Sequence, residues 1–420
     1  MLVLIASLIV AVFGAGMPTG PHVIDRTVAP SEEAKAGVTD LLRRRAEAIR
    51  ARDRAGFAAT LDPKAAPEFR DAQLALFANL AAVPLASWEY LFDAADPSDV
   101  PRSQVDRSAD EVWAPRTELR YALAGADLEV TGRPAGYLYL RRGDSWYLAS
   151  DTALDEVGRP TWRGVWDFGP CHVARAEHGL VIGHPASAPL IDLLAKELDG
   201  SVAAVTAVWG PGWPGRVAVL VPGGPAELRA LLGPRDPADS IAAITLADRV
   251  DRAAGKAWGQ RVVINPGQSV QLGPTAVRVV LRHEITHVAA QVATDDRAPL
   301  WLKEGFAEYV GYLDSGLAIA EAAPALLEQA RREQLPDYPP PDGAFRGPGL
   351  MLAYQQSWSL MRLVGERVGP KGVVGLYRSL AAEPGATAQP RLDQTLRATL
   401  GKDLDDLMDD WHDELADEVE

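Results

Sequence analysis

The chain has 420 residues, of which 47% are hydrophobic and 24% are charged, so it is long enough for two or three globular domains. Its 57 acidic residues outnumber its 42 Lys and Arg, and the net charge of -15 makes nucleic acid an unexpected partner, because phosphates are repelled. The single cysteine, Cys171, cannot form an intramolecular disulfide and is expected to be a small, partly buried apolar residue.

Residues 1–24 are expected to be a signal peptide or an N-terminal anchor. Met1–Val12 is almost entirely apolar, and Gly14 and Gly16 could flank a cleavage point. An apolar run of about 13 to 16 residues is shorter than the ~20 that span a bilayer as a helix. No basic residue precedes Arg26, which keeps a buried N-terminal helix or an uncleaved anchor as alternatives. We expect an extracytoplasmic protein, secreted or in the cell envelope, with membrane anchoring only through this segment.

Residues 25–155 show the pattern of an α+β domain. Ser31 is a predicted N-cap, followed by Glu32 and Glu33 in the first helical turn, and a second helix is predicted over Pro67–Leu80. Strand-like stretches follow at 86–92, 110–121, 127–140 and 145–149. Helices followed by an antiparallel sheet indicate the α+β class.

Within this region, the segment LLRRRAEAIRARDRAGFAATLDP (41–63) resembles the opening of the cone-shaped α+β domains related to nuclear transport factor and ketosteroid isomerase. The resemblance covers about 120 residues and implies a binding or spacer module, because no catalytic Asp or Tyr of that family matches. Asp53 and Asp62 are expected to be cap and turn residues instead.

A linker, or alternatively an interface strand between domains, is expected over 156–170, and a second domain over 171–420. Short apolar runs interpreted as strands alternate with helical stretches at 187–198 and 225–232; these runs are 180–182, 203–209, 217–221, 241–246 and 261–264. His172, His178 and His184 are spaced too regularly and too far apart for a compact metal site, and structural roles are expected for them. Packing helices are predicted over 373–380, 392–400 and 404–419.

The most informative motif is HEITH at 283–287, in a helical stretch over Thr275–Val292. Successive helical residues turn by about 100°, so His283 and His287 lie on one face and can bind one metal ion together. Glu284 lies about 100° from His283, which suits a general base that takes a proton from water near the metal. Two solvated histidines on a surface helix are the alternative.

A third ligand is expected from the next helical stretch, Pro299–Val310. Glu304 could return to the two histidines if this helix runs back along the first. Glu308 lies one turn beyond it, and such a carboxylate commonly accepts the second ring N–H of a metal-binding histidine. Two solvated helix carboxylates are the alternative.

HEITH followed by WLKEGFAEYV (301–310) resembles the gluzincin metallopeptidases, and in particular the peptidase MA-like group related to thermolysin and the zinc aminopeptidases. The match covers roughly 200–385. It implies a zincin-like domain, with a mixed sheet and active-site helices, that binds Zn2+ and hydrolyses a peptide or protein substrate. The matching positions are the zinc ligands His283, His287 and Glu304, the general base Glu284 and the second-shell carboxylate Glu308.

Further expectations concern the substrate cleft and the type of peptidase. RVVINPGQ (261–268) resembles the edge strand above the zinc, with an ordinary strand as the alternative, and the proline-rich segment 336–349 is expected to form a loop that could rim the cleft. Tyr354 matches the tyrosine that hydrogen-bonds the oxyanion, although Gln-Gln-Ser follows it where aminopeptidases have Lys-Gly-Ala; a core tyrosine is the alternative. The absence of a G-x-M-E-N motif favours an endopeptidase over an exopeptidase.

A rival interpretation is a non-catalytic cell-envelope binding protein built on a metallopeptidase scaffold. The ligand set and Glu284 are all present in the sequence, which favours the enzyme. The sequence carries no signal for an oligomeric state.

Overall fold

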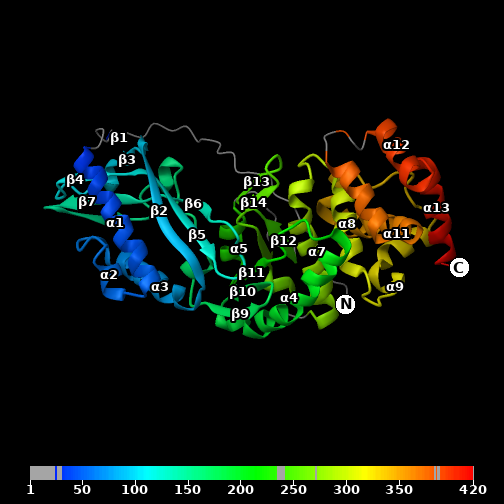
Figure 1. The fold of residues 1–420 in the computed structure, drawn as a ribbon, viewed down its shortest axis with the longest axis horizontal. Helices are drawn as coiled ribbons and strands as arrows, with labels where there is room; N and C mark the ends of the chain where they lie inside the picture. Colours follow the sequence, from blue (N-terminus) through cyan, green and yellow to red (C-terminus); the bar gives the residue numbers. More distant parts are fainter. Residues whose placement is uncertain are drawn as a thin grey trace.

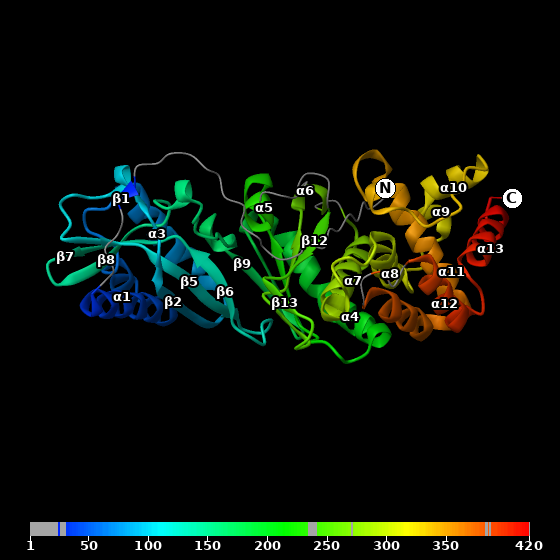
Figure 2. The ribbon, with the colours of Figure 1, turned by 90° about the horizontal axis from the view of Figure 1, so that it is seen from above.

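Residues 24–25, 31–233, 242–269, 272–382, 385 and 388–419 are described by a computed structural model of the chain. An N-terminal α+β lobe, a central five-stranded sheet and a group of C-terminal helices follow one another along the long axis (Figures 1 and 2). The α+β class is therefore confirmed. The expected signal segment lies almost wholly outside the described residues, and no helix among those described is long and apolar enough to cross a membrane.

The N-terminal lobe packs helices against antiparallel strands, as expected. Ser31 caps the first helix by accepting a hydrogen bond from the Ala34 N–H at 3.1 Å, and the buried side chains of Val38, Leu41 and Ile49 line its inner face. The helices are α1 (Glu32–Ala51), α2 (Arg54–Ala58) and α3 (Pro67–Asn79). Two three-stranded sheets follow, in the orders β2-β5-β6 and β4-β7-β8. Their strands are β2 (Leu85–Pro97), β4 (Glu111–Trp113), β5 (Pro115–Leu123), β6 (Thr131–Ala135), β7 (Leu138–Arg142) and β8 (Ser145–Ser150), while β1 (Ile24–Asp25) pairs with β3 (Val100–Pro101).

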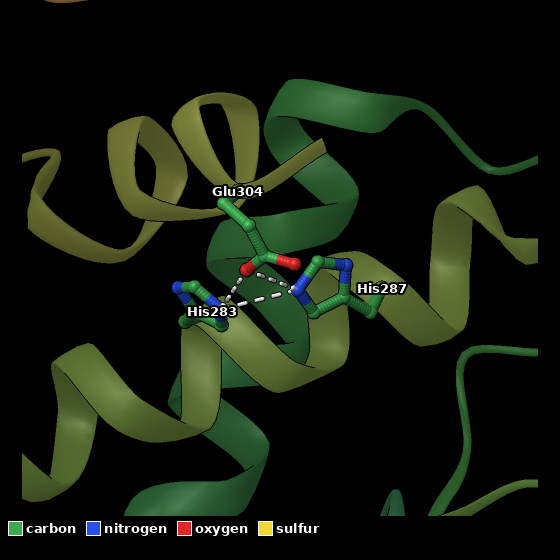
Figure 3. Close-up of side chains that lie close together, drawn as sticks. All are labelled: His283, His287 and Glu304. Carbon is green, nitrogen blue, oxygen red and sulfur yellow. Dashed lines mark hydrogen bonds and ion pairs between the residues drawn. The ribbon is translucent and has the colours of Figure 1, made fainter. Parts of the chain in front are cut away.

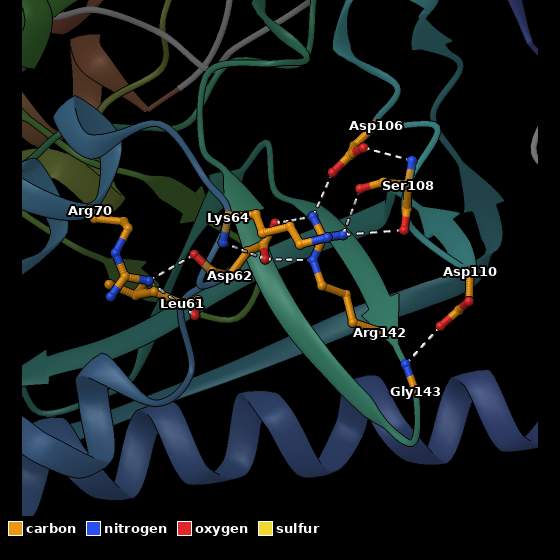
Figure 4. A network of polar contacts seen from close by, with 9 residues as sticks. All are labelled: Leu61, Asp62, Lys64, Arg70, Asp106, Ser108, Asp110, Arg142 and Gly143. Carbon is orange, nitrogen blue, oxygen red and sulfur yellow. Dashed lines mark hydrogen bonds and ion pairs between the residues drawn. The ribbon is translucent and has the colours of Figure 1, made fainter.

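Asp53 and Asp62 have the structural roles predicted for them. Asp53 caps α2, and Asp62 accepts a hydrogen bond from the Lys64 N–H in a turn. Figure 4 shows that Asp62 also binds the guanidinium of Arg142 through both carboxylate oxygens, at 2.8 Å each. Arg142 reaches Asp106 as well, and this hydrogen bond lowers the pKa of Asp106 to about 2.

The central sheet is mixed, with the strand order β12-β15-β11-β10-β9. Its three inner strands are parallel and its two outer pairings are antiparallel. Apolar side chains from one face pack on two long helices, α4 (Ala188–Trp209) and α7 (Pro274–Ala290). The strands are β9 (His172–Ala176), β10 (Gly179–Gly183), β11 (Val217–Val221), β12 (Ala243–Leu246) and β15 (Arg261–Ile264); the hairpin β13 (Arg249–Asp251) and β14 (Lys256–Trp258) and the helices α5 (Pro225–Leu232) and α6 (Pro266–Ser269) connect them.

Two expectations about this sheet are wrong. The apolar run 203–209 is the last part of α4 and not a strand, because Val202, Val205 and Trp209 recur at helical spacing on its buried face. The segment 261–268 does not begin with an edge strand: β15 lies between β12 and β11, since the chain leaves β12 through the β13–β14 hairpin and returns inside it. In the described chain, β12 is the edge strand on this side.

The N-terminal lobe and the second face of the central sheet share one apolar core. Leu180, Leu220 and Ile244 of the sheet belong to the same buried cluster as the aromatic side chains of the lobe. Val165 and Trp166 of the segment 156–170 are buried in it, so this part of the segment packs between the lobe and the sheet. The lobe therefore covers this face of the sheet together with α5, whose Leu228, Leu231 and Leu232 lie in the same cluster.

Polar contacts add to this shared core. Arg261 at the start of β15 binds both carboxylate oxygens of Asp127, at 2.6 and 2.8 Å, and these side chains are only 4% and 8% exposed. Asp248, just after β12, accepts a hydrogen bond from Thr131 at 2.6 Å and forms an ion pair with Arg133. The far end of β12 is thus tied to strand β6 of the lobe.

The packing helices predicted over 373–380, 392–400 and 404–419 are confirmed, whereas two short helices between 319 and 331 were not predicted. The long helix α11 is interrupted at Gly369, whose φ of 70° is left-handed, and at Pro370. Its first half packs on α8, beside the central sheet. The helices are α8 (Leu300–Tyr312), α9 (Ile319–Ala322), α10 (Pro324–Arg331), α11 (Leu350–Ala381), α12 (Gln389–Leu400) and α13 (Leu404–Asp417).

Asp127→Asn is expected to lower the free energy of unfolding by roughly 3–5 kcal/mol, because it leaves the buried guanidinium of Arg261 without its counter-charge. Chemical denaturation measures this change. Glu129→Gln is the matched control two residues away: its ion pair with Lys256 is about half exposed and is expected to contribute less than about 1 kcal/mol. Equal losses in both variants would contradict the importance given to the buried pair.

Candidate metal centre

The helix that carries HEITH is buried along most of its length. The predicted helix over 275–292 is confirmed as α7, which begins at Pro274 and ends at Ala290. Val277, Leu281 and Ile285 anchor it in the core beneath the sheet. His283 and Glu284 are fully buried, so the solvated surface helix is excluded.

Small residues let α8 approach both of its neighbours. A Cβ atom on Gly305 would lie 2.7 Å from the Ser357 carbonyl oxygen of α11, and one on Gly311 would lie 3.0 Å from the Val279 carbonyl oxygen of α7. Side chains at these two positions would push the helices apart. Gly311 therefore permits the close approach of α8 to α7, and Gly305 permits its close approach to α11.

Three side chains meet where α7 and α8 pack (Figure 3). The Nε2 atoms of His283 and His287 are 3.1 Å apart, and the Oε2 atom of Glu304 lies 3.3 Å from the first and 3.4 Å from the second. Donor atoms about 2.0–2.1 Å from an ion at tetrahedral angles are separated by about 3.3 Å. The three separations therefore match three corners of a tetrahedral metal site. In the described chain, this is the one group of three or more His, Cys, Asp or Glu that could hold a metal ion.

The polar atoms of this group are poorly satisfied by the protein itself. Both carboxylate oxygens of Glu304 are buried without a hydrogen bond of good geometry. Burial opposes the ionisation of Glu304, but attraction to His287 and the contacts with both imidazoles outweigh it, and its pKa falls to about 2. An ionised carboxylate and two imidazole nitrogens form a donor set that suits zinc.

Glu308 lies behind His283, as expected for a group that orients the imidazole. Its Oε1 atom is 3.6 Å from the Nδ1 atom of His283, on the side away from Glu304. Burial, together with the nearby charges of Glu304 and Glu284, raises the pKa of Glu308 well above its usual value. The ionised form of Glu308 is thus disfavoured beside the other two carboxylates, and a divalent cation held by the two histidines and Glu304 would reduce that repulsion.

Sequence reasoning missed the partner of Glu284. The hydroxyl of Thr245, on the edge strand β12, lies 2.7 Å from the Oε2 atom of Glu284 and 3.0 Å from its carbonyl oxygen. Thr245 is the one polar residue in the run IAAITLA (241–247), which marks it as unusual in a buried strand but does not identify its partner.

Tyr354 lies near the metal group, in the first turns of α11. It is buried, with its ring centroid 6.4 Å from that of His283 and 5.3 Å from that of Phe345. Phe345 belongs to the proline-rich segment 336–349, which forms short 3-10 turns against α11. Asp342 in this segment accepts a hydrogen bond from the Leu300 N–H at 2.8 Å, so the segment also caps α8.

The other candidate groups stay apart from this centre. His172 binds Asp192 at 3.0 Å and His178 binds Asp199 at 3.2 Å, both at the surface. His184 lies between two acceptors, with Nδ1 3.0 Å from the Pro170 carbonyl oxygen and Nε2 2.9 Å from Glu227. These contacts bear out the structural roles expected for the three histidines.

Cys171 is partly buried, as expected. Burial raises the pKa of its thiol to about 12, so the reactive thiolate is disfavoured.

No protein-family model matches the chain, and no curated protein is significantly similar to it.

Glu227→Gln is expected to destabilise the fold more at about pH 5.5 than at about pH 9. The hydrogen bond with Glu227 raises the pKa of His184 against the effect of burial, so the pair stabilises the fold fully below the unfolded pKa. This contribution is lost as the pH rises through the raised pKa. Urea denaturation at the two pH values measures it. In a His184→Asn background the cost of Glu227→Gln should be the same at both; a persisting difference would show that another group is responsible.

Proposed function

We propose that the protein is a zinc-dependent peptidase of the gluzincin type that cleaves internal bonds of a peptide or protein substrate. The observation that carries this proposal is the meeting of His283, His287 and Glu304, with donor atoms 3.1–3.4 Å apart in the buried contact between α7 and α8. The resemblance of HEITH and WLKEGFAEYV to the gluzincin pattern supports the same assignment.

In the proposed reaction, each of the site residues has a separate role. When bound, zinc would act as a Lewis acid that polarises the scissile carbonyl and makes water more acidic. Glu284 takes a proton from the attacking water and passes it to the leaving amine. Glu308 Oε1 lies 3.6 Å from the Nδ1 atom of His283, and a closer approach when the metal is bound would let it accept the Nδ1–H and leave the Nε2 lone pair directed at the metal position. The hydroxyl of Tyr354 donates a hydrogen bond to the developing oxyanion.

The edge strand offers a way to hold an extended substrate. In the described chain, β12 pairs with β15 on one side only, and its Thr245 contacts Glu284. A peptide that adds to the open side of β12 would bind through main-chain hydrogen bonds, next to the general base. This role, predicted for 261–268, passes to β12 in the proposal.

We further propose export through the N-terminal segment, with a substrate outside the cytoplasm. The apolar run in Met1–Val12 is the feature that supports this localisation.

A second candidate function is a non-catalytic cell-envelope binding protein that keeps the metal site as a structural element. The observation that favours it is burial: His283, Glu284 and Glu304 are each 0% exposed. Structural zinc sites are closed, whereas catalytic sites keep an open position for water or substrate.

Glu284→Gln tests the two candidates directly. The purified wild-type protein, supplied with zinc and desalted, is expected to retain about one ion per chain by elemental analysis and to cleave a protein substrate such as casein. Glu284→Gln should keep the zinc and lose turnover, while His287→Ala should lose both. Full activity in either variant would refute the assignment. Zinc retention without any hydrolysis by the wild type would favour the structural site.

Tyr354→Phe is expected to reduce kcat by roughly 10²-fold with little change in KM, because the lost hydroxyl acts on the oxyanion. Steady-state kinetics on the same substrate measure the effect. Tyr312→Phe, on α8 and outside the proposed machinery, is the matched control and should keep the wild-type rate. An unchanged rate in Tyr354→Phe would make Tyr354 a packing residue.

A further inference from the structure

The carboxylate of Glu284 is held by a strand far from it in the sequence. Thr245 Oγ1 lies 2.7 Å from Glu284 Oε2 and 3.0 Å from the Glu284 carbonyl oxygen, and both residues are buried. A hydroxyl has one proton to donate. The charged oxygen is the stronger acceptor and is the closer one, so the proton is directed to the carboxylate.

The position of the hydroxyl is fixed by the strand. Thr245 pairs with Val262 of β15, and alternate residues of β12 point to opposite faces of the sheet. Ala243, two residues earlier, belongs to the core beside α7, whereas Ile244 belongs to the core shared with the N-terminal lobe. Thr245 is therefore directed at α7, and its β-branched side chain has few rotamers available.

The strand itself is anchored beyond Thr245. Asp248, three residues later, accepts a hydrogen bond from the Thr131 hydroxyl, and its main-chain N–H donates to the Trp258 carbonyl oxygen at 2.9 Å. Arg133 forms an ion pair with the same carboxylate. A shift of β12 along α7 would break these contacts.

We propose that Thr245 is a positioning residue for Glu284: its hydroxyl fixes one carboxylate oxygen and so restricts rotation of the general base beside the metal centre. This inference rests on the proposed function. It assigns to the edge strand a side-chain role in the reaction, separate from any main-chain contact with a substrate.

Thr245→Val removes the hydroxyl while keeping the shape of the side chain. We expect unchanged zinc content, an unchanged KM and a kcat lower by roughly 10- to 100-fold, the loss that corresponds to one hydrogen bond to a charged group. Thr245→Ser keeps the hydroxyl and should restore most of kcat. Thr245→Ala, which also lacks the hydroxyl, replaces the valine variant if that protein does not fold.

A double-mutant cycle tests whether Thr245 acts through Glu284. In a Glu284→Gln background, Thr245→Val should cause no further loss of residual activity, because the carboxylate is already absent. A loss of similar size in both backgrounds would overturn the proposal, as would wild-type kcat in Thr245→Val or loss of its zinc.

A binding measurement separates this proposal from the proposed function. Acetohydroxamate chelates zinc and can donate a hydrogen bond to a carboxylate beside the ion. Its affinity for the zinc-loaded protein, measured by calorimetry, should fall in Thr245→Val, recover in Thr245→Ser and be insensitive to Thr245 in the Glu284→Gln background. Equal affinities in the wild type and Thr245→Val would overturn the proposal. Failure of the wild type to hydrolyse any substrate would refute the peptidase function, and the affinities would still decide the role of Thr245.

Discussion

The close, buried packing of α7 against α8 is the feature on which the rest of the structure depends, because it brings His283, His287 and Glu304 together. The glycine at 311 allows this approach, the glycine at 305 lets α11 pack closely on the other side of α8, and the surrounding apolar core excludes water from the contact. Three carboxylates in such a place carry a high desolvation cost, because each ionised group has lost its water. The packing of the sheet on one side and of α11 on the other must therefore offset this cost in any form of the protein that lacks a bound cation.

The N-terminal lobe takes part in this arrangement from a distance. It covers one face of the central sheet and ties down Asp248, at the end of the strand that carries Thr245. The β13–β14 hairpin continues the connection: Arg252 in its turn binds Asp295, in the loop between the two ligand helices, at 2.6 Å. The continuous segment from β12 to β14 thus contacts strand β6 of the lobe through Asp248, Glu284 through Thr245, and the loop between the two ligand helices through Arg252.

Local sequence patterns predicted most of the helices and the candidate site residues. They did not predict which strands are neighbours in the sheet or which distant side chains contact each other. His283 and His287 could be placed together because a helix fixes the geometry of residues one turn apart, whereas Glu304 depended on the expectation that the next helix runs back along the first. The run 203–209 was misassigned, since a short apolar stretch looks alike in a buried helix and a buried strand. Long-range topology, which no local sequence period encodes, decides that β12 and not β15 is the edge strand. It also decides the contact between Thr245 and Glu284.

The shared core has a consequence for dividing the chain. A fragment that began at the second predicted domain would lose the aromatic side chains of the lobe that share a core with Leu180, Leu220 and Ile244, and would expose apolar surface next to an open strand edge. Such a surface favours self-association and intermolecular strand pairing. Covering this surface would make the N-terminal lobe a built-in solubility partner for the part of the chain that carries the candidate metal ligands.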